Sequence, residues 1–323
     1  MCYNLKLTHN LNYMNSNNYG YIFNHIQFTE NHVIKMAKNE KGLFKINNEI
    51  LFYNKINKEH ISFPIPKLIL SNDGILKIKY IKNASVLTYH VNNTNIDNYI
   101  NNISEHLNVL HSNIISVSRE LIIKDTIQEV ENKIIKRYNE GNWEMNELFN
   151  KINTVNNVKI RKDISFYIKI IKHRLVELIN KLGINKYNLI HGDTHLGNIL
   201  LDNSNNIYFI DPRGYFGNTK LYGLKQYDFA KLLFGLSGYS VFDNMNIEKL
   251  YINNDNLNIE FIKNYEYVFQ NDSFDEITQL FSLSIWLGNN SCFLNVKKKF
   301  LSLMISFYYC EKYLINSKKS ENK

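Results

Sequence analysis

Short apolar runs alternate with turn-forming residues in the first 85 positions, which is the pattern of β-strands. The turns are Thr29-Glu30-Asn31 and Ser71-Asn72-Asp73-Gly74, and the Asp-Gly pair in the second is a strong hairpin signal. Four strands are therefore predicted, at residues 20–28, 32–38, 68–70 and 75–81. Between the two pairs, one helix is predicted by the apolar face of Ile46, Ile50, Tyr53 and Ile56.

The apolar period becomes helical from about residue 95 onward. The clearest helix spans residues 164–182, where Asp163 is a natural N-cap and Gly183 a natural stop. An earlier helical face is predicted from Ile103, Leu107, Leu110 and Ile114. Further helices are expected at residues 226–238, 257–269, 274–288 and 295–315.

These elements predict an α+β fold with two lobes. A chain of 323 residues is long enough for two domains. We expect a small, β-rich N-terminal lobe over residues 1–84 and a larger helical lobe over residues 85–323. The hydrophobic share of 44% and the charged share of 21% are those of a globular protein.

The net charge, the length of the apolar runs and the first residues give expectations about partners and location. The 38 basic and 30 acidic residues give a net charge of +8, but the lysines are scattered and only Lys297-Lys298-Lys299 is a dense run. No nucleic-acid recognition motif accompanies them, so we expect no nucleic-acid partner. No apolar run reaches the ~18 residues of a membrane helix, and the first residues lack a signal-peptide core. A cytoplasmic protein without a membrane partner is expected, with a basic surface that suits anionic substrates.

Residues 188–211 interrupt the helical pattern and carry the strongest chemical signal. A short strand, residues 188–190, leads into a polar loop that ends at Gly197. Two apolar runs then follow, residues 199–201 and 207–210, separated by five turn formers. This spacing predicts a β-hairpin.

The predicted hairpin brings Asn198, before its first strand, close to Asp211, after its second. An amide oxygen and a carboxylate at one point suit Mg²⁺. Asp193, in the same loop, is placed to accept a proton from an attacking hydroxyl. A metal and a base are what phosphoryl transfer requires. Asp and Asn also commonly cap strands, but the whole set around one hairpin favours a functional site.

The run His-Gly-Asp-Thr-His-Leu-Gly-Asn-Ile-Leu (191–200), followed by Phe-Ile-Asp (209–211), resembles the aminoglycoside phosphotransferase and choline kinase group. The resemblance implies a two-lobed, protein-kinase-like fold and an ATP-dependent, Mg²⁺-dependent kinase of small molecules. By resemblance Asp193 is the catalytic base, and Asn198 and Asp211 bind Mg²⁺. His191 and His195 are expected to brace the loop.

The resemblance extends into the first lobe, where the residues that hold ATP are expected. Lys35, flanked by apolar residues, matches the lysine that holds ATP phosphates, although it could instead be an edge-strand lysine. Glu49 is its expected ion-pair partner, and Glu40 is a weaker candidate. Lys79, Tyr80 and Ile81 fall at the hinge whose backbone binds adenine. The phosphate-covering loop is expected at residues 16–21, with Gly20 as its single glycine.

After Asp211 the chain resembles a branch of these enzymes found alongside sugar-nucleotide and surface-polysaccharide enzymes. The matching run begins Asp211-Pro212-Arg213-Gly214 and includes Tyr227-Asp228-Phe229-Ala230-Lys231-Leu232. Arg213 is expected either to clamp the γ-phosphate or an anionic acceptor, or to hold the loop through a salt bridge with Asp228. Asp228 is expected to bond the catalytic loop.

The sequence therefore predicts a phosphotransferase that moves the γ-phosphoryl of ATP to a hydroxyl of a small molecule. Sugars, amino alcohols and aminoglycosides are all open as acceptors. A protein Ser/Thr kinase is disfavoured because Asp-Pro-Arg stands where Asp-Phe-Gly is expected and no Ala-Pro-Glu follows. A non-catalytic nucleotide-binding protein on a kinase fold is the other alternative, suggested by the weak phosphate loop.

Overall fold

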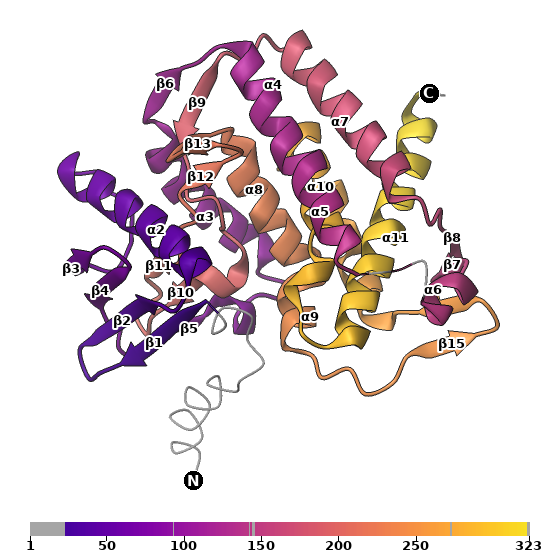
Figure 1. Ribbon diagram of the computed structural model, residues 1–323, viewed down its shortest axis with the longest axis horizontal. Helices are drawn as coiled ribbons and strands as arrows, with labels where there is room; N and C mark the ends of the chain where they lie inside the picture. The colour runs from indigo at the N-terminus through magenta and orange to yellow at the C-terminus, as the bar shows by residue number, and fades with distance from the viewer. Residues whose placement is uncertain (1–22, 93, 142, 144–145, 272, 322–323) are drawn as a thin grey trace.

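The computed structural model describes residues 23–92, 94–141, 143, 146–271 and 273–321. A small β-rich part lies on one side of a larger helical part (Figure 1), as the sequence predicts. The small part is a four-stranded antiparallel sheet in the order β1-β2-β4-β3 with one helix, α2, packed against it. Its elements are β1 (Asn24–Phe28), β2 (His32–Ala37), α2 (Glu40–Lys58), β3 (Leu68–Asn72) and β4 (Ile75–Lys79).

Both predicted turns of the small part are present. Thr29 closes the β1–β2 turn, donating its N–H to the carbonyl of His32 at 2.9 Å. Gly74 takes a φ of +69° between β3 and β4, a conformation that costs glycine little. Asn39 begins α2 by accepting a hydrogen bond from the N–H of Gly42. The predicted strand over residues 20–28 is confirmed from Asn24; residues 20–22 lie outside the described residues.

The larger part holds helices with short sheets between them. Its helices are α3 (Ile96–His111), α4 (Arg119–Ile127), α5 (Lys133–Asn139), α6 (Glu147–Lys151), α7 (Ile164–Lys181), α8 (Lys225–Phe234), α9 (Ser240–Asn244), α10 (Glu276–Leu287) and α11 (Val296–Glu321). One π-helical turn (Gln128–Asn132) joins α4 to α5, and another (Gly235–Tyr239) joins α8 to α9. Single 3₁₀ turns lie at Leu87–Tyr89, Leu196–Asn198 and Asn290–Cys292.

The strands of this part are short. They are β5 (Ser85–Val86), β6 (Ile114–Ser116), β7 (Thr154–Val155), β8 (Val158–Lys159), β9 (Lys186–Leu189), β10 (Ile199–Leu201), β11 (Ile207–Phe209), β12 (Tyr215–Phe216), β13 (Thr219–Lys220), β14 (Tyr222–Gly223), β15 (Tyr251–Asn253) and β16 (Asn256–Asn258). The predicted hairpin is β10–β11, and β5 joins its edge, so the order is β11-β10-β5. A second sheet, β14-β9-β6, lies beside the loop that follows β9.

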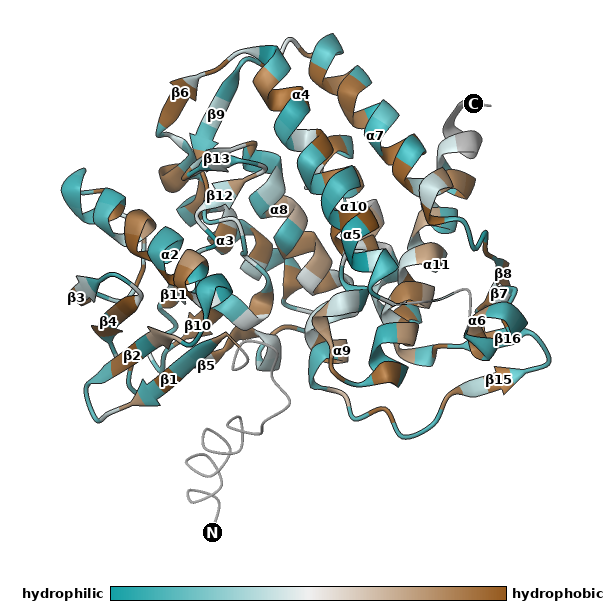
Figure 2. Cartoon of the chain, in the orientation of Figure 1, coloured by the Kyte–Doolittle hydropathy of each residue, from teal (hydrophilic) through white to brown (hydrophobic). Residues whose placement is uncertain are grey.

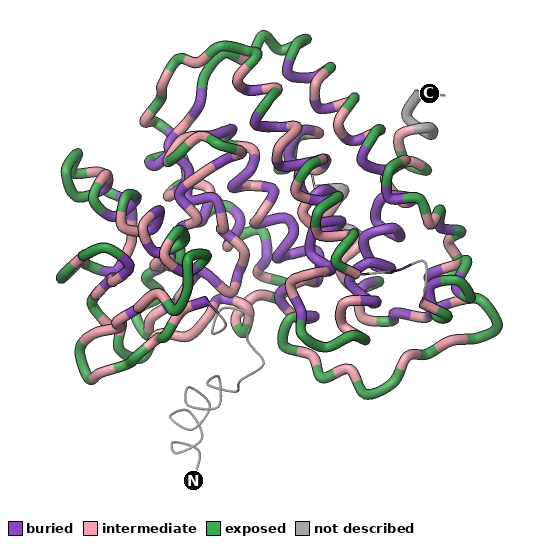
Figure 3. Tube along the Cα trace, in the orientation of Figure 1, coloured by how far each residue is buried: buried purple, intermediate pink, exposed green. Residues whose placement is uncertain are grey.

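Packing in the helical part centres on α10. Hydrophobic residues run along α10 in Figure 2, and it packs against α7, α8 and α11. Its Trp286 is fully buried. The outer sides of α2, α4 and α7 are exposed in Figure 3, whereas the central helices are buried. None of the helices within the described residues is long and apolar enough to cross a membrane.

One helical prediction is wrong at its C-terminal end. The face predicted from Ile103 to Ile114 stops at His111, and Ile114 lies in β6 with 51% of its surface exposed. The side-chain amide of Asn113 donates to the carbonyl of Leu110, which caps the helix end. Beyond it, Ile114 pairs with Asn188 of β9. Asparagine's preference for capping over helix interiors explains the early stop.

The helix predicted over residues 257–269 is also wrong in kind. Residues 256–258 form strand β16, and Glu260–Gln270 is a 3₁₀ helix. The buried positions recur every three residues, at Ile259, Ile262 and Val268, with partly buried Tyr265 between them. A spacing of three matches the three residues per turn of a 3₁₀ helix.

The predicted caps of α7 are both present, which allows a direct test of one of them. The carboxylate of Asp163 accepts a hydrogen bond from the N–H of Phe166 at 3.1 Å, and Gly183 follows the helix with a φ of +61°. We expect Asp163→Ala to lower the free energy of unfolding by about 1 kcal/mol, because an orphan amide loses its acceptor. Urea unfolding measures this, with Asp163→Ser as the control that keeps an acceptor. Equal midpoints for the Ala and Ser variants would contradict the cap.

Candidate active site

The candidate site is built on the chain between β9 and the end of β11. β9 leads into a loop from Ile190 to His195, the 3₁₀ turn carries Asn198, and the hairpin β10–β11 returns the chain to Asp211. Ile210 donates its N–H to the carbonyl of Asn198 at 2.9 Å, so the open ends of the hairpin are held together. The side-chain amide of Asn198 donates to the backbone carbonyl of Asp193, also at 2.9 Å. The hairpin thus brings Asp193, Asn198 and Asp211 into one region.

A buried carboxylate on α8 holds this loop from behind. Asp228 has no exposed surface, and it accepts the N–H groups of His191 at 3.0 Å and Gly192 at 2.6 Å. Its Oδ2 lies 2.9 Å from Nε2 of His111 at the end of α3. Thr194 donates its hydroxyl to the backbone carbonyl of Asp228. The predicted bonding role of Asp228 is therefore what the structure shows.

Asp193 faces a lysine that the sequence analysis did not single out. Its Oδ1 lies 2.9 Å from Nζ of Lys231, one turn after Asp228 on α8. Burial works against the charged carboxylate, but the charge of Lys231, with a smaller effect from His195, outweighs it and holds the pKa of Asp193 well below its usual range. Asp193 is therefore ionised at neutral pH, as a proton acceptor must be.

Lys35 joins the small sheet to the helical part. Its Nζ lies 2.7 Å from Oε1 of Glu49 on α2 and also pairs with Oδ1 of Asp211. Lys35 and Glu49 are buried, whereas the Asp211 side chain is 47% exposed. Burial alone would lower the pKa of Lys35, but Asp211 and Glu49 together raise it, so the ammonium stays charged. The predicted Lys35–Glu49 pair is present, and Glu40, exposed at the first position of α2, does not take part in it.

Asn198 and Asp211 fit a magnesium site in the chemistry of their donors. Both offer hard oxygens, and the amide nitrogen of Asn198 is engaged by Asp193, which fixes the orientation of its side chain. Asp211 takes a φ of +57°, a conformation that non-glycine residues adopt mainly where their surroundings enforce it. No cluster of three or more His, Cys, Asp or Glu suited to a metal occurs in the described part of the chain. Two protein oxygens are typical of Mg²⁺ that is held together with nucleotide phosphates.

The two histidines of the motif are structural in their contacts. His191 is fully buried among Phe52, Phe63 and Phe209, and its Nδ1 accepts the N–H of Asp193 at 3.3 Å. Burial lowers the pKa of His191, so it is neutral. His195 accepts the N–H of Gly197 through Nδ1 at 3.2 Å. Both histidines therefore support the backbone on either side of Asp193.

The residues expected at the hinge lie at the end of β4: Lys79 is its last residue, and Tyr80 and Ile81 follow it. The N–H of Lys79 donates to the carbonyl of Lys67 at 2.8 Å, and the N–H of Tyr80 donates to the carbonyl of Asn31 at 2.9 Å. Both amides thus extend the sheet. Of the backbone N–H groups expected to bind adenine, those of Lys79 and Tyr80 are therefore already hydrogen-bonded within the protein. The loop expected over the phosphates, residues 16–21, lies outside the described residues.

Arg213 does not pair with Asp228, so that expectation is wrong. Its guanidinium pairs with both carboxylate oxygens of Glu129, in the π-helical turn after α4, and donates to the hydroxyl of Tyr227 at 2.6 Å. The guanidinium also lies 3.9 Å from the ring centre of Tyr215. Asp228 is unavailable to it because the loop amides and His111 already surround that carboxylate. The contacts of Arg213 match the loop-holding alternative.

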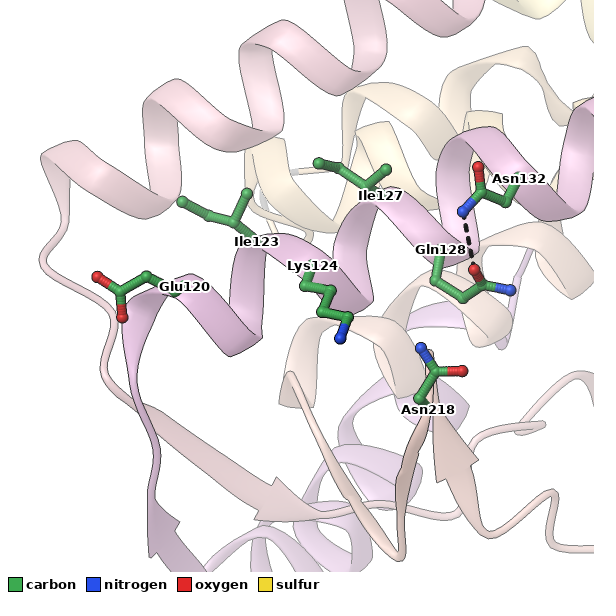
Figure 4. A pocket seen from close by; sticks show the side chains of 7 residues that line it. All are labelled: Glu120, Ile123, Lys124, Ile127, Gln128, Asn132 and Asn218. Carbon is green, nitrogen blue, oxygen red and sulfur yellow. Dashed lines mark hydrogen bonds between the residues drawn. The ribbon is translucent and has the colours of Figure 1, made fainter.

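Sequence reasoning missed Lys231, Glu129 and the cations near Glu129. Lys231 could have been found from Asp228, since residues three apart lie on the same helix face. Glu129, Lys133 and Arg137 recur every four residues, a polar stripe along one helix face. A separate hollow of about 400 Å³ lies between the α4–α5 segment and Asn218 (Figure 4). None of the residues expected in the site lines it.

The loop's dependence on Asp228 can be measured. We expect Asp228→Ala to lower the free energy of unfolding by about 3 kcal/mol, because the His191 and Gly192 amides and His111 lose a buried acceptor. Thermal or urea unfolding measures the change. Asp202→Ala, in the exposed turn of the β10–β11 hairpin, is the control and should cost less. An Asp228→Ala variant as stable as the control would show that the loop is held by other contacts.

No family model matches this sequence, and no curated protein matches it. Solved structures do. The gentamicin complex of APH(2")-IIa is 15% identical, with 96% of each chain covered and a TM-score of 0.47. The choline kinase LicA from Streptococcus pneumoniae is 13% identical, with 91% of this chain and 89% of that chain covered and a TM-score of 0.49. A glucosamine kinase is 11% identical, with 89% and 74% covered and a TM-score of 0.48. These are the kinds of enzyme that the loop motif resembles, and an activity for this chain has to follow from its own side chains.

Proposed function

We propose that this protein is an ATP-dependent phosphotransferase that moves the γ-phosphoryl of ATP to a hydroxyl of a small molecule. The observation that carries the proposal is that one site contains two separate sets of ion pairs. Lys35 is held by Glu49 and Asp211, and an ionised Asp193 is held by Lys231. A fixed cation for phosphates beside a fixed base for a hydroxyl is the minimum that phosphoryl transfer needs.

Each residue has a separate task in this reaction. Lys35 binds phosphate oxygens of ATP, and Glu49 keeps its ammonium in place. Asp193 orients the acceptor hydroxyl and takes its proton as the new oxygen–phosphorus bond forms. The bond from the γ-phosphorus to the bridging oxygen breaks, and ADP leaves with that electron pair. Holding the reacting groups in line contributes most of the rate in such reactions.

Asn198 and Asp211 would hold Mg²⁺ in this scheme. A bound divalent cation neutralises phosphate charge and fixes the phosphate oxygens. Asp211 lies two residues after β11, and its half-exposed carboxylate pairs with Lys35. The side-chain amide of Asn198 donates to the backbone carbonyl of Asp193, which links the proposed metal ligand to the loop that carries the proposed base.

Lys231 has two effects on the transfer. Its charge keeps Asp193 ionised while the site is free, and it places a second cation next to the oxygen that attacks. Negative charge builds up on the phosphoryl oxygens during transfer, and a fixed cation stabilises it. The side chain of Lys231 is only 14% exposed, so water screens this charge weakly.

A protein kinase is disfavoured by the segment after Asp211. Helix α8 begins at Lys225, which leaves 224 − 211 = 13 residues. Three short strands, β12, β13 and β14, and the turns between them span residues 215–223, and β14 pairs with β9 beside the loop. No length remains there for an activation segment that would bind a peptide. A peptide array with labelled ATP tests this alternative, and phosphorylation of peptides but not of small molecules would favour it.

The base is tested by removing its charge with little change in shape. We expect Asp193→Asn to lower kcat by about 10²- to 10⁴-fold while ATP binding is retained, because an amide cannot take the hydroxyl proton. ADP release with pooled sugars, amino alcohols and aminoglycosides measures turnover, and Asp202→Asn in the hairpin turn is the control. Full turnover in Asp193→Asn would overturn the assignment. Nucleotide binding without turnover in the wild type would favour the non-catalytic alternative.

Lys35 is tested through nucleotide affinity. We expect Lys35→Met to weaken ATP binding about tenfold or more, since a buried charge-assisted contact to phosphate is lost. Lys77→Met is the matched control. Lys35 lies opposite Leu76, so Lys77 points to the other face of the same sheet. Isothermal titration calorimetry with Mg-ATP measures the affinity of each variant. Equal affinities in the two variants would show that Lys35 does not bind the phosphates.

A further inference from the structure

Four cations gather around Glu129 and Tyr227, close to Asp193, and among the described residues their ion pairs involve only the carboxylates of Glu129 and Asp193. This cation cluster comprises Lys133 and Arg137 on α5, Lys231 on α8, and Arg213. Arg213 and Lys133 both pair with Glu129, and Lys231 pairs with Asp193. With every member charged, the cluster carries a net charge of 4 − 2 = +2.

The members of the cation cluster lie together because one face of α8 meets one face of the segment that contains the π-helical turn and α5. Tyr227 and Lys231 are four residues apart on α8, and the Tyr227 hydroxyl lies within 3.4 Å of Nζ of Lys133 and 3.0 Å of Glu129. Glu129, Lys133 and Arg137 follow one another every four residues on the facing helix. Arg213 approaches from the other side. A Cβ atom added to Gly192, the neighbour of Asp193, would lie 3.1 Å from the Cβ of Arg213. The cluster therefore begins directly at the base.

Two of these cations have hydrogen-bonding capacity that no group in the described part of the chain uses. Arg137 donates Nη1 to the carbonyl of Gly288 at 2.7 Å, and it forms no ion pair with a carboxylate in the described ranges. Lys133 shares Glu129 with Arg213, whose guanidinium takes both oxygens. Burial, and after it the charge of Arg213, lower the pKa of Lys133 to about 7. The ammonium of Lys133 therefore has no carboxylate of its own to balance its charge among the described residues.

A further carboxylate near the site, that of Asp243, does not balance the positive charge of the cation cluster. Asp243 on α9 interacts with His195 and Lys298, and burial raises its pKa. Lys298 donates to the backbone carbonyl of Asp243 at 2.8 Å. A cationic acceptor would meet repulsion from the cation cluster, and a neutral acceptor would leave it unbalanced. An acceptor with its own negative charge would balance it.

We infer that the hydroxyl acceptor carries an anionic group, a carboxylate or a phosphate, and that Lys133 and Arg137 bind this group while its hydroxyl faces Asp193. The inference rests on the proposed function, because it names the acceptor class of that same site. Lys133 and Arg137 are then specificity residues. The fork of an arginine and the point charge of a lysine are both suited to carboxylate and phosphate oxygens.

Binding without turnover is the first arm of the test. The full-length protein is saturated with Mg-ADP, and inorganic phosphate, glucuronate, glucose and choline are titrated by calorimetry. Phosphate or glucuronate should bind, and Arg137→Gln and Lys133→Gln should each weaken that binding about tenfold. Lys136→Gln, exposed on the same helix, is the matched control. Arg137→Lys keeps the charge and should retain most of the binding, which separates loss of charge from misfolding.

Turnover is the second arm, with glucose, glucosamine, glucuronate and glucose 6-phosphate as acceptors of matched ring shape. The anionic acceptors should give the higher kcat/KM, and Arg137→Gln should raise their KM without changing the KM of ATP. Failure of both anions to bind, or equal binding by Arg137→Gln and the wild type, overturns the inference. So does a neutral or cationic acceptor whose turnover Arg137→Gln leaves unchanged, although the proposed function then stands. Anion binding without ADP release from any acceptor supports the anion site and contradicts the proposed function.

Discussion

The site depends on one buried carboxylate. Asp228 has no access to water, and a lone charge in such a place would be strongly unfavourable. It is tolerated because two loop amides and His111 surround it. The loop is therefore as fixed as the helix that carries Asp228. Since α3, the loop and α8 meet at this group, its loss would release three segments together, and Asp193 would lose its defined position.

The two ion-pair groups built on this framework divide the work of the site. Lys35 ties the small sheet to Asp211, so the cation that we propose for phosphate is positioned by both parts of the molecule. Lys231 belongs to the same helix as Asp228, so the group that holds Asp193, the proposed base, also comes from the element that holds the loop. Preorganised charges of this kind need no rearrangement when charge develops during a reaction, which is why they are effective in catalysis.

Sequence patterns predicted what depends on neighbours along the chain. The hairpin between Asn198 and Asp211, the caps of α7 and the helix that carries Glu49 all follow from local spacing. The Lys35–Glu49 pair was expected from a family resemblance, and the structure contains it. The partner of Arg213 could not be predicted, because Glu129 is 84 positions away in the chain and Asp228 was an equally reasonable acceptor. The lobe boundary at residue 84 and the roles assigned to the site residues stay predictions.

The cation cluster lowers the stability of the free protein but favours the binding of an anion. Like charges held close together in a partly buried place lower the free energy of unfolding. The pKa of about 7 for Lys133 reflects its burial first and the nearby charge of Arg213 second. A surface selected only for stability would replace Lys133 or Arg137 with a neutral residue, since Glu129 is already satisfied by Arg213 and Tyr227. Unbalanced charge next to the proposed base is what we expect of a binding site that awaits its counter-charge. The same excess of positive charge that disfavours the free protein would then discriminate among acceptors, because only an anionic one relieves it.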